Sequence, residues 1–332
     1  MPDQVQIQEF QIQEFQIQEF QIQELWSVRR KEKRAKPEGD EMAKPEGDEK
    51  AAGRTRLYIN GPDGLDGPDG NDVPDCRLAE GVALELGPER FHYLRHVLRL
   101  PLGAVVAVFN ARDGEWRAEI ESFSKVSCRL RVGQRLRGPV LSGCDLWLLF
   151  APLKRVALEY MVEKATELGV ARLLPIVTKH TDMARINLPR LNAIATAAAE
   201  QCERLSVPEI AVPESLTRTL AQWPTSCGPT KARPLLVCAE SGVVQPIAAA
   251  VAALPSGPVA ILIGPEGGLA ISELDELVRL PLVVTVGLGP LVLRAETAAL
   301  AAVACWQALR GDWSVGGITD VRPPFRAGAP IL

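Results

Sequence analysis

Histidine is scarce in this chain of 332 residues, which contains three, and its seven cysteines include no Cys-x-x-Cys pair. Clusters of these two residue types build most zinc sites, so we expect no metal centre. An odd number of cysteines without paired spacing also argues against a disulfide framework. It favours reduced thiols in a cytosolic protein, and we expect a cytoplasmic location.

Long apolar runs are also missing, because no stretch reaches the roughly 20 residues that a membrane-spanning helix needs. The first ten residues, MPDQVQIQEF, lack the basic and apolar regions of a secretory signal. We therefore expect no membrane partner.

Short repeats fill the first fifty residues: QIQEF occurs three times and is followed by QIQEL, and AKPEGDE then occurs twice. A period of five matches neither the helix nor the strand repeat, so no stable apolar face forms. We interpret residues 1–53 as a disordered leader. The basic stretch RRKEKRAK at 29–36 leaves an RNA-binding arm as the alternative.

A β-rich region follows between residues 54 and 140. Residues 76–155 carry 13 basic and 8 acidic side chains, a balance compatible with an RNA partner. Short strands at close intervals suggest a small barrel. The pattern predicts a helix over 89–100, strands over 105–110, 116–120 and 128–132, and a hairpin turn at 111–114.

From residue 145 the pattern changes to alternating strands and helices, which indicates an α/β domain with a largely parallel sheet. On the first helix we expect one buried stripe of Val156, Tyr160, Met161, Ala165 and Leu168. The predicted strands are 145–150, 171–178, 234–240, 259–264 and 282–289, and the predicted helices are 154–169, 188–205 and 296–311.

Three turns follow strands of this sheet, at 238–240, 264–268 and 287–294, where open α/β sheets bind ligands. The middle turn, GPEGG, carries neither the GK[ST] of a phosphate loop nor the GxGxxG of a dinucleotide site. Its glycines suit close approach of a ligand with an adenine ring, a ribose and a charged amino-acid tail. The alternative is a plain connection into a helix with Ser272 as N-cap and Asp275 completing a capping box.

Two more motifs accompany this turn: LGPLVLRAETAAL at 288–300, and EKATELGV at 163–170 together with AAAEQCERLSVPEI at 197–210. In this order they resemble the uracil-N3 methyltransferases of small-subunit ribosomal RNA, a family of the SPOUT class. The resemblance extends from about residue 54 to 313. It implies a small PUA-like RNA-binding β-barrel at 54–140 and an α/β SPOUT methyltransferase domain at 141–313, with a parallel sheet and a C-terminal deep trefoil knot. The leader at 1–53 and a tail at 314–332 flank these two domains.

The resemblance further implies S-adenosylmethionine as cofactor, bound in a bent form, and a homodimer with its active site near the subunit interface. The expected substrate is small-subunit (16S) ribosomal RNA, free or in the assembled subunit. By position, the cofactor-binding residues are Cys238, Ala239, Glu240, Gly264, Pro265, Glu266, Gly267, Gly268, Leu288, Gly289, Leu293 and Thr297.

Methylation of uridine N3 requires loss of its proton, so some group must accept that proton or stabilise the uracil anion. We predict that Arg294 stabilises the anion or grips a phosphate, and that Glu296 acts beside it. The alternatives are an Arg294–Glu296 surface pair and a glutamate that merely suits the start of a helix. Glu266 either orients the cofactor or is a solvated loop residue.

Basic residues of the β-rich region are the expected RNA contacts, and a solvated charged face is the alternative. Glu200 and Gln201 are expected to face RNA or the partner subunit, with plain surface placement left open. The predicted RNA-binding residues are Arg95, His96, Arg99, Arg129 and Arg131.

Two positions depart from the family pattern. Leu291 stands where the family usually has the arginine of LGPR, and Glu203 stands where EQCG is usual. The loss of the arginine charge motivates one alternative, an RNA-binding ribosome-assembly protein with weak or no methyl transfer. A second alternative is an unrelated nucleotide-binding α/β enzyme.

Overall fold

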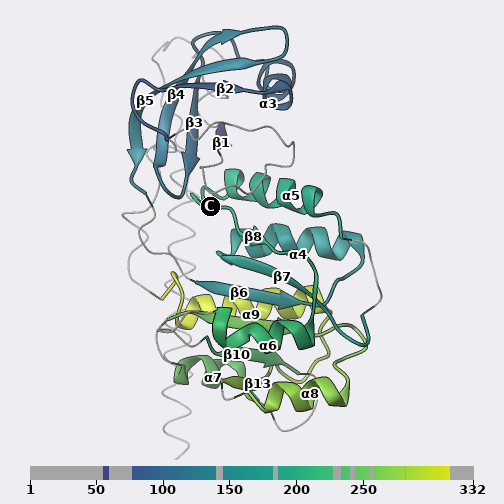
Figure 1. The fold of residues 1–332 in the computed structure, drawn as a ribbon. Helices are drawn as coiled ribbons and strands as arrows, with labels where there is room; N and C mark the ends of the chain where they lie inside the picture. The colour runs from purple at the N-terminus through teal and green to yellow at the C-terminus, as the bar shows by residue number, and fades with distance from the viewer. Residues whose placement is uncertain are drawn as a thin grey trace, which may run out of the picture. The chain divides into compact units, whose positions relative to one another are not determined.

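A computed structural model of the chain describes residues 55–59, 77–139, 145–181, 186–226, 233–239, 244–254, 257–280 and 282–314 (Figure 1). The proposed leader at 1–53, the tail beyond 314 and Glu240 lie outside these residues. Within the described part of the chain, no helix is both long enough and apolar enough to cross a membrane.

The N-terminal β-domain contains one five-stranded sheet with strand order β1-β3-β4-β5-β2, in which only the β1–β3 pair is parallel. The three strands predicted from alternation are confirmed, and the second and third are longer than predicted. The strands are β1 (Arg56–Tyr58), β2 (Ala83–Leu86), β3 (Val105–Asn110), β4 (Gly114–Phe123) and β5 (Cys128–Arg137).

The predicted hairpin turn between β3 and β4 depends on Gly114. Its φ of +87° is left-handed, and a Cβ there would overlap the backbone carbonyl oxygen of Arg137. Only glycine satisfies both conditions without strain. Asp113 completes the turn, since its backbone N–H donates to Asn110 Oδ1 at 2.6 Å.

The predicted helix at 89–100 is shorter than expected. It consists of α3 (Pro88–His92) and a π-helical turn, η1 (Tyr93–Val97). Arg99 has a φ of +54°, and the N–H of Leu100 donates to the carbonyl of Leu94 at 3.0 Å. This is the bonding of a left-handed helix C-cap, so Arg99 lies in the turn that ends the helix and not on its face.

The α/β domain is built on a sheet of order β11-β13-β10-β12-β6-β7-β8, in which every pair is parallel and β9 also pairs with β7. The central strands are buried apolar runs, as the sequence predicts for a sheet covered on both faces. The strands are β6 (Leu146–Phe150), β7 (Arg172–Val177), β8 (Glu209–Ile210), β9 (Glu214–Ser215), β10 (Leu235–Cys238), β11 (Gln245–Pro246), β12 (Val259–Ile263) and β13 (Val283–Gly287).

Helices cover both faces of this sheet (Figure 1). The core on one face joins α4, α5, α7 and α9, whereas the core on the other face joins α6 and α8. The helices are α4 (Arg155–Glu167), α5 (Leu188–Gln201), α6 (Leu216–Ser226), α7 (Ile247–Ala253), α8 (Ile271–Val278) and α9 (Ala295–Leu309).

The predicted buried stripe of α4 is wrong in part. Met161 and Ala165 are buried, but Val156 is 81% exposed and Tyr160 48% exposed. Leu158 and Val162 take the core positions instead. Helical periodicity allows either of two overlapping apolar stripes on this sequence, and the core uses the one that contains Leu158 and Val162.

The start of α8 also differs from the prediction. Its N-cap is Ala270 and not Ser272, and the backbone N–H of Ala270 donates to Glu273 Oε2 at 2.8 Å. The other carboxylate oxygen of Glu273 accepts the backbone N–H of Lys179 at 2.8 Å, and the Glu273 side chain is buried. Glu273 therefore ties the start of α8 to the loop that follows β7.

Arg56 of β1 joins the two domains, which belong to one compact unit. Its Nη1 donates to the carbonyls of Ala199 and Glu200 at 3.0 Å each, so the guanidinium caps the C-terminal end of α5. The last carbonyls of a helix lack intrahelical partners and attract a cation. Arg56 Nε also donates to Glu115 Oε1 at 2.6 Å, and the guanidinium lies 4.0 Å from the ring centre of Phe109.

Glu200 belongs to this junction, which corrects the expectation that it faces RNA or a partner subunit. Its carboxylate accepts the backbone N–H of Tyr58 at 3.0 Å and pairs with Arg90 at 2.9 Å. Gln201 beside it is exposed. The acid of the AAAEQC motif thus holds α5 against the β-domain.

Glu203 follows the C-cap of α5 and has a φ of +65°. Glycine is favoured at this position, and a left-handed conformation costs any other residue about 1–2 kcal/mol. The Glu203 carboxylate attracts Arg56, and its carbonyl accepts a bond from Arg137 Nη2 at 2.7 Å. Where the resemblance leads us to expect glycine, Glu203 thus keeps a strained backbone conformation and adds a second negative charge at the junction.

We predict that Glu115→Gln lowers the free energy of unfolding by about 3–5 kcal/mol, because it leaves two largely buried guanidiniums without their shared carboxylate. Glu115 is fully buried and pairs with Arg56 and Arg137, each at 2.6 Å. Glu121→Gln, on the same strand, is the matched control: its carboxylate is partly exposed and pairs with Arg131 at 2.6 Å. That change costs at most about 1 kcal/mol. Urea unfolding measures both, and equal losses would contradict the prediction.

Candidate active site at the carboxyl edge of the parallel sheet

The three turns that the sequence singles out start side by side. Cys238, the last residue of β10, is opposite Ile263 of β12 on one side and Val286 of β13 on the other. The backbone N–H of Ala239 donates to the carbonyl of Val286 at 3.0 Å. Because all three strands are parallel, their turns leave the same edge of the sheet.

The middle turn, 264–268, presents backbone rather than side chains. Pro265 is buried, whereas Glu266 and Gly267 are exposed. The N–H of Gly268 donates to the carbonyl of Pro265 at 2.8 Å, and Gly268 has a φ of +71° with open space where a Cβ would stand. The glycine is required here by conformation, and it leaves the backbone accessible to a ligand.

His180 contacts this turn and was not predicted. Its Nδ1 lies 3.0 Å from the carbonyl oxygen of Gly268, and its Cβ would lie 3.4 Å from a Cβ placed on Gly267. Lys179, its neighbour, donates from Nζ to Ser272 Oγ at 2.7 Å. The sequence offered one signal for this residue, which is its position. His180 comes three residues after the end of β7, so it lies at the same edge of the sheet as the three turns.

The third turn runs from β13 into α9. Leu288 and Leu293 are half-buried, and Gly289 has a φ of +108° with open space where a Cβ would stand. Leu291 is 76% exposed and Val292 80% exposed. Apolar side chains therefore project from this turn, beside a glycine that keeps the backbone open.

Arg294 and Glu296, the predicted catalytic pair, lie at the start of α9. Arg294 is the N-cap and is exposed, and Glu296 is half-buried in the first turn, followed by exposed Thr297. Among the described residues these two side chains make no ion pair with each other.

The first turn adds a neutral sulfur. Burial raises the pKa of Cys238 to about 12, and Cys305 on α9 contributes in the same direction. A thiol with so high a pKa stays protonated near neutral pH, so Cys238 is not a ready nucleophile. Within the described ranges, no group of three or more His, Cys, Asp or Glu side chains is placed to hold a metal ion.

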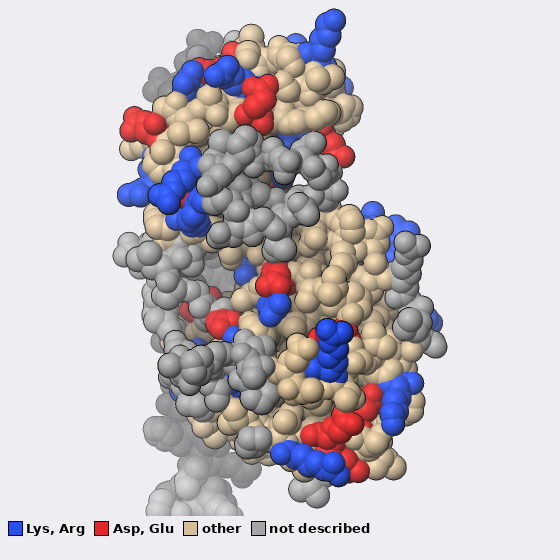
Figure 2. All heavy atoms as spheres, in the orientation of Figure 1, with Lys and Arg blue, Asp and Glu red and all other residues tan. Residues whose placement is uncertain are grey.

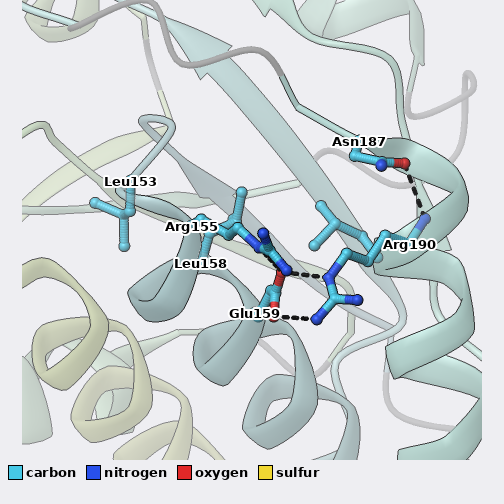
Figure 3. Close-up of a pocket in the computed structure, with 7 residues that line it drawn as sticks. Leu153, Arg155, Leu158, Glu159, Asn187 and Arg190 are labelled. Carbon is cyan, nitrogen blue, oxygen red and sulfur yellow. Dashed lines mark hydrogen bonds and ion pairs between the residues drawn. The ribbon is translucent and has the colours of Figure 1, made fainter.

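A cavity of about 360 Å³ opens near the same edge, between α4 and α5 (Figure 3). Glu159 lies between two arginines there, and its pKa is lowered to about 2 by hydrogen bonds from Arg190 and Arg155. This cavity was not predicted. Its lining residues are Leu153, Arg155, Leu158, Glu159, Asn187, Arg190 and Leu191.

The predicted RNA contacts are exposed but do not form one cluster. Arg95 lies 5.0 Å from the ring centre of Phe123, on the sheet face that the helix covers. Arg129 and Arg131 alternate with buried residues along β5 and both pair with Glu121. They therefore point from the opposite face. His96 packs on the ring of Phe91. Figure 2 shows acidic and basic side chains interspersed over the surface of the β-domain.

Comparison with known sequences assigns both domains. The profile of an RNA methyltransferase domain matches residues 141–307, and that of an RNA methyltransferase PUA domain matches residues 86–133. Ribosomal RNA small subunit methyltransferase E of Rickettsia conorii is 31% identical over 231 residues, covering 69% of this chain and 91% of the relative. The protein of the same name from Bacillus subtilis is 28% identical over 256 residues, covering 71% and 95%.

Solved structures agree in fold. A ribosomal RNA small subunit methyltransferase E from Neisseria gonorrhoeae, bound to S-adenosyl methionine, matches with a TM-score of 0.62 at 22% identity, covering 78% of this chain and 99% of that one. The Legionella pneumophila protein Lpg2936, solved with bound SAM, matches with a TM-score of 0.59 at 27% identity, covering 78% and 98%. With half of the sequence matched by the domain profile and nearly the whole Rickettsia relative covered, this chain belongs to the RNA methyltransferase family that comprises the ribosomal RNA small subunit methyltransferases E.

Proposed function

We propose that this protein transfers a methyl group from S-adenosylmethionine to N3 of a uridine in small-subunit (16S) ribosomal RNA. The observation that carries the proposal is the meeting of three turns at one sheet edge, in a chain of this family. In this proposal residues 54–140 bind RNA, residues 141–313 carry the reaction, and residues 1–53 and 314–332 are a leader and a tail.

The three turns fit this cofactor. Gly268 and Gly289 leave open space beside the backbone, where N–H and carbonyl groups can bind an adenine and a ribose. Half-buried Leu288 and Leu293 offer apolar contact for the ring. When bound, the cofactor supplies an electrophilic methyl group on sulfur. The residues that would hold it are Cys238, Ala239, Glu240, Gly264, Pro265, Glu266, Gly267, Gly268, Leu288, Gly289, Leu293 and Thr297.

Arg294 is proposed to stabilise the uracil anion. Loss of the N3 proton places negative charge on the flanking carbonyl oxygens, and a guanidinium can donate two hydrogen bonds to such an acceptor. The exposed N-cap position of Arg294 and the lack of a pair with Glu296 leave it able to do so. Glu296, in the first turn of α9, is proposed to orient the substrate or the guanidinium.

The order of the strands supports a knotted chain. β10 precedes β12 and β13 in the sequence but lies between them, and α9 then returns to pack on α4, α7 and β12. We propose that this path is the deep trefoil knot of the SPOUT class, and that the five-stranded sheet of the β-domain is its PUA-like barrel.

A homodimer in the cytoplasm is part of the proposal. Leu291 and Val292 of the third turn are adjacent and exposed, and an apolar pair beside the candidate site is suited to contact with a partner subunit. The RNA would contact Arg95, His96, Arg99, Arg129 and Arg131 on the β-domain.

We predict that Gly289→Val weakens S-adenosylmethionine binding by about tenfold or more, a loss of about 1.4 kcal/mol, because the side chain fills the open space beside the third turn. Gly257→Val is the matched control, since Gly257 also has positive φ, +140°, and open space, but precedes β12 at the other edge of the sheet. Calorimetry measures both variants. Equal weakening, or wild-type binding of ATP or NAD instead, would contradict the assignment.

We predict that Arg294→Ala lowers the rate of methyl transfer about 10²–10³-fold, as for removal of one donor to a developing anion, without loss of cofactor affinity. Arg279→Ala, at the exposed C-cap of α8, is the control and keeps the wild-type rate. Mass spectrometry of nucleosides from 16S rRNA measures 3-methyluridine. A wild-type protein that binds RNA but forms none would favour the assembly-protein alternative.

A further inference from the structure

The cavity between α4 and α5 has an apolar floor and a charged rim. Leu153, Leu158 and Leu191 are almost fully buried and form the floor. Arg155 on α4 and Arg190 on α5 form the rim, and their side chains are 74% and 47% exposed (Figure 3). At about 360 Å³ the cavity lies within the roughly 300–1,000 Å³ typical of small-ligand sites.

One carboxylate serves both arginines. Glu159 accepts from Arg155 Nε at 2.8 Å and from Arg190 Nη2 at 2.8 Å, and Arg190 Nε also donates to it. Two positive charges and one negative charge leave the rim with a net charge of +1. Each guanidinium has five N–H groups, and those not bound to Glu159 make no hydrogen bond to another side chain in the described residues.

The geometry of the rim is held from both helices. Asn187, the N-cap of α5, accepts the backbone N–H of Arg190 at 3.1 Å, which fixes the start of that helix. Glu159 holds the two arginine side chains across the gap between the helices. Less side-chain entropy is therefore lost when these guanidiniums bind an anion.

The cavity lies beside the candidate active site along the sheet edge. Phe150, the last residue of β6, is opposite Ile263, and the N–H of Ala151 donates to the carbonyl of Ile263 at 3.1 Å. The segment that carries Leu153 and Arg155 therefore leaves the sheet next to the start of the turn at 264–268. Arg155 and the turn at 264–268 thus follow the carboxyl ends of two paired strands.

We propose that this cavity binds a nucleotide that neighbours the target uridine, with its base against the leucine floor and its phosphate on Arg155 and Arg190. The inference rests on the proposed function and adds a substrate subsite to it. A phosphate ester joined to a flat apolar ring is the chemistry that matches the rim and the floor. A free mononucleotide shares that chemistry, so the test includes one.

The test measures binding of full-length 16S rRNA transcript to the intact protein by filter binding over a series of salt concentrations. Arg155→Ala and Arg190→Ala are each expected to weaken binding about five- to tenfold and to lower the salt slope by about 0.7–1, the effect of one lost phosphate contact. Glu159→Gln frees both guanidiniums and is expected to tighten binding about threefold or more. A loss of folding would weaken RNA binding in all three variants. Weaker binding in the two arginine variants together with tighter binding in Glu159→Gln therefore indicates a binding role.

Arg218→Ala is the matched control. Arg218 also pairs with a glutamate in an i,i+4 arrangement, Glu214, and is 70% exposed, but it lies outside the cavity. If Arg155→Ala and Arg190→Ala change RNA affinity no more than Arg218→Ala does, or if Glu159→Gln weakens binding, the proposal is overturned. Binding of uridine 5′-monophosphate that depends on both arginines, without an effect on RNA affinity, would overturn it in favour of a small-molecule site.

The outcomes also separate the two proposals. RNA affinity that falls in the arginine variants of a protein that forms no 3-methyluridine would support the subsite and reject the proposed reaction. Formation of 3-methyluridine by the wild-type protein, with RNA affinity unchanged in the arginine variants, would reject the subsite alone.

Discussion

Parallel pairing of β10 with β12 on one side and β13 on the other is the constraint on which the candidate site depends. It sets Cys238 opposite both Ile263 and Val286, so that three segments far apart in the sequence leave the sheet together. β10 and β12 are buried apolar runs, β13 is half-buried apart from Val286, and the pairing satisfies the backbone groups of all three strands. The hydrophobic core thus fixes the position of turns that themselves carry few buried side chains.

The sequence was sufficient for elements whose signal is local. The apolar runs of β6, β10, β12 and β13 and the hairpin turn at Gly114 were predicted within a few residues. It was insufficient where two local solutions compete, as on α4, where Val156 and Tyr160 form an apolar stripe that the core does not use. Contacts between distant segments were inaccessible: His180 reaches Gly268, and Arg190 reaches Glu159, through tertiary structure alone.

The two departures from the family pattern have different physical meanings. Glu203 lies at the junction of the domains, where it adds a negative charge beside Arg56 and keeps a left-handed backbone without glycine. Leu291 is exposed on the third turn beside Val292, so an apolar side chain stands where the resemblance leads us to expect an arginine. The first departure concerns how the domains are held, and the second concerns what approaches the candidate site.

One end of helix α5 lies at the junction of the domains, and the other lies beside the cavity between α4 and α5. Arg56 caps its C-terminal carbonyls from the β-domain, and Asn187 caps its first turn beside the cavity that holds Arg190. Fourteen residues of α-helix form a stiff rod about 21 Å long. The junction with the β-domain and the rim of the cavity are therefore joined by one rigid element, so the position of either end of α5 sets that of the other.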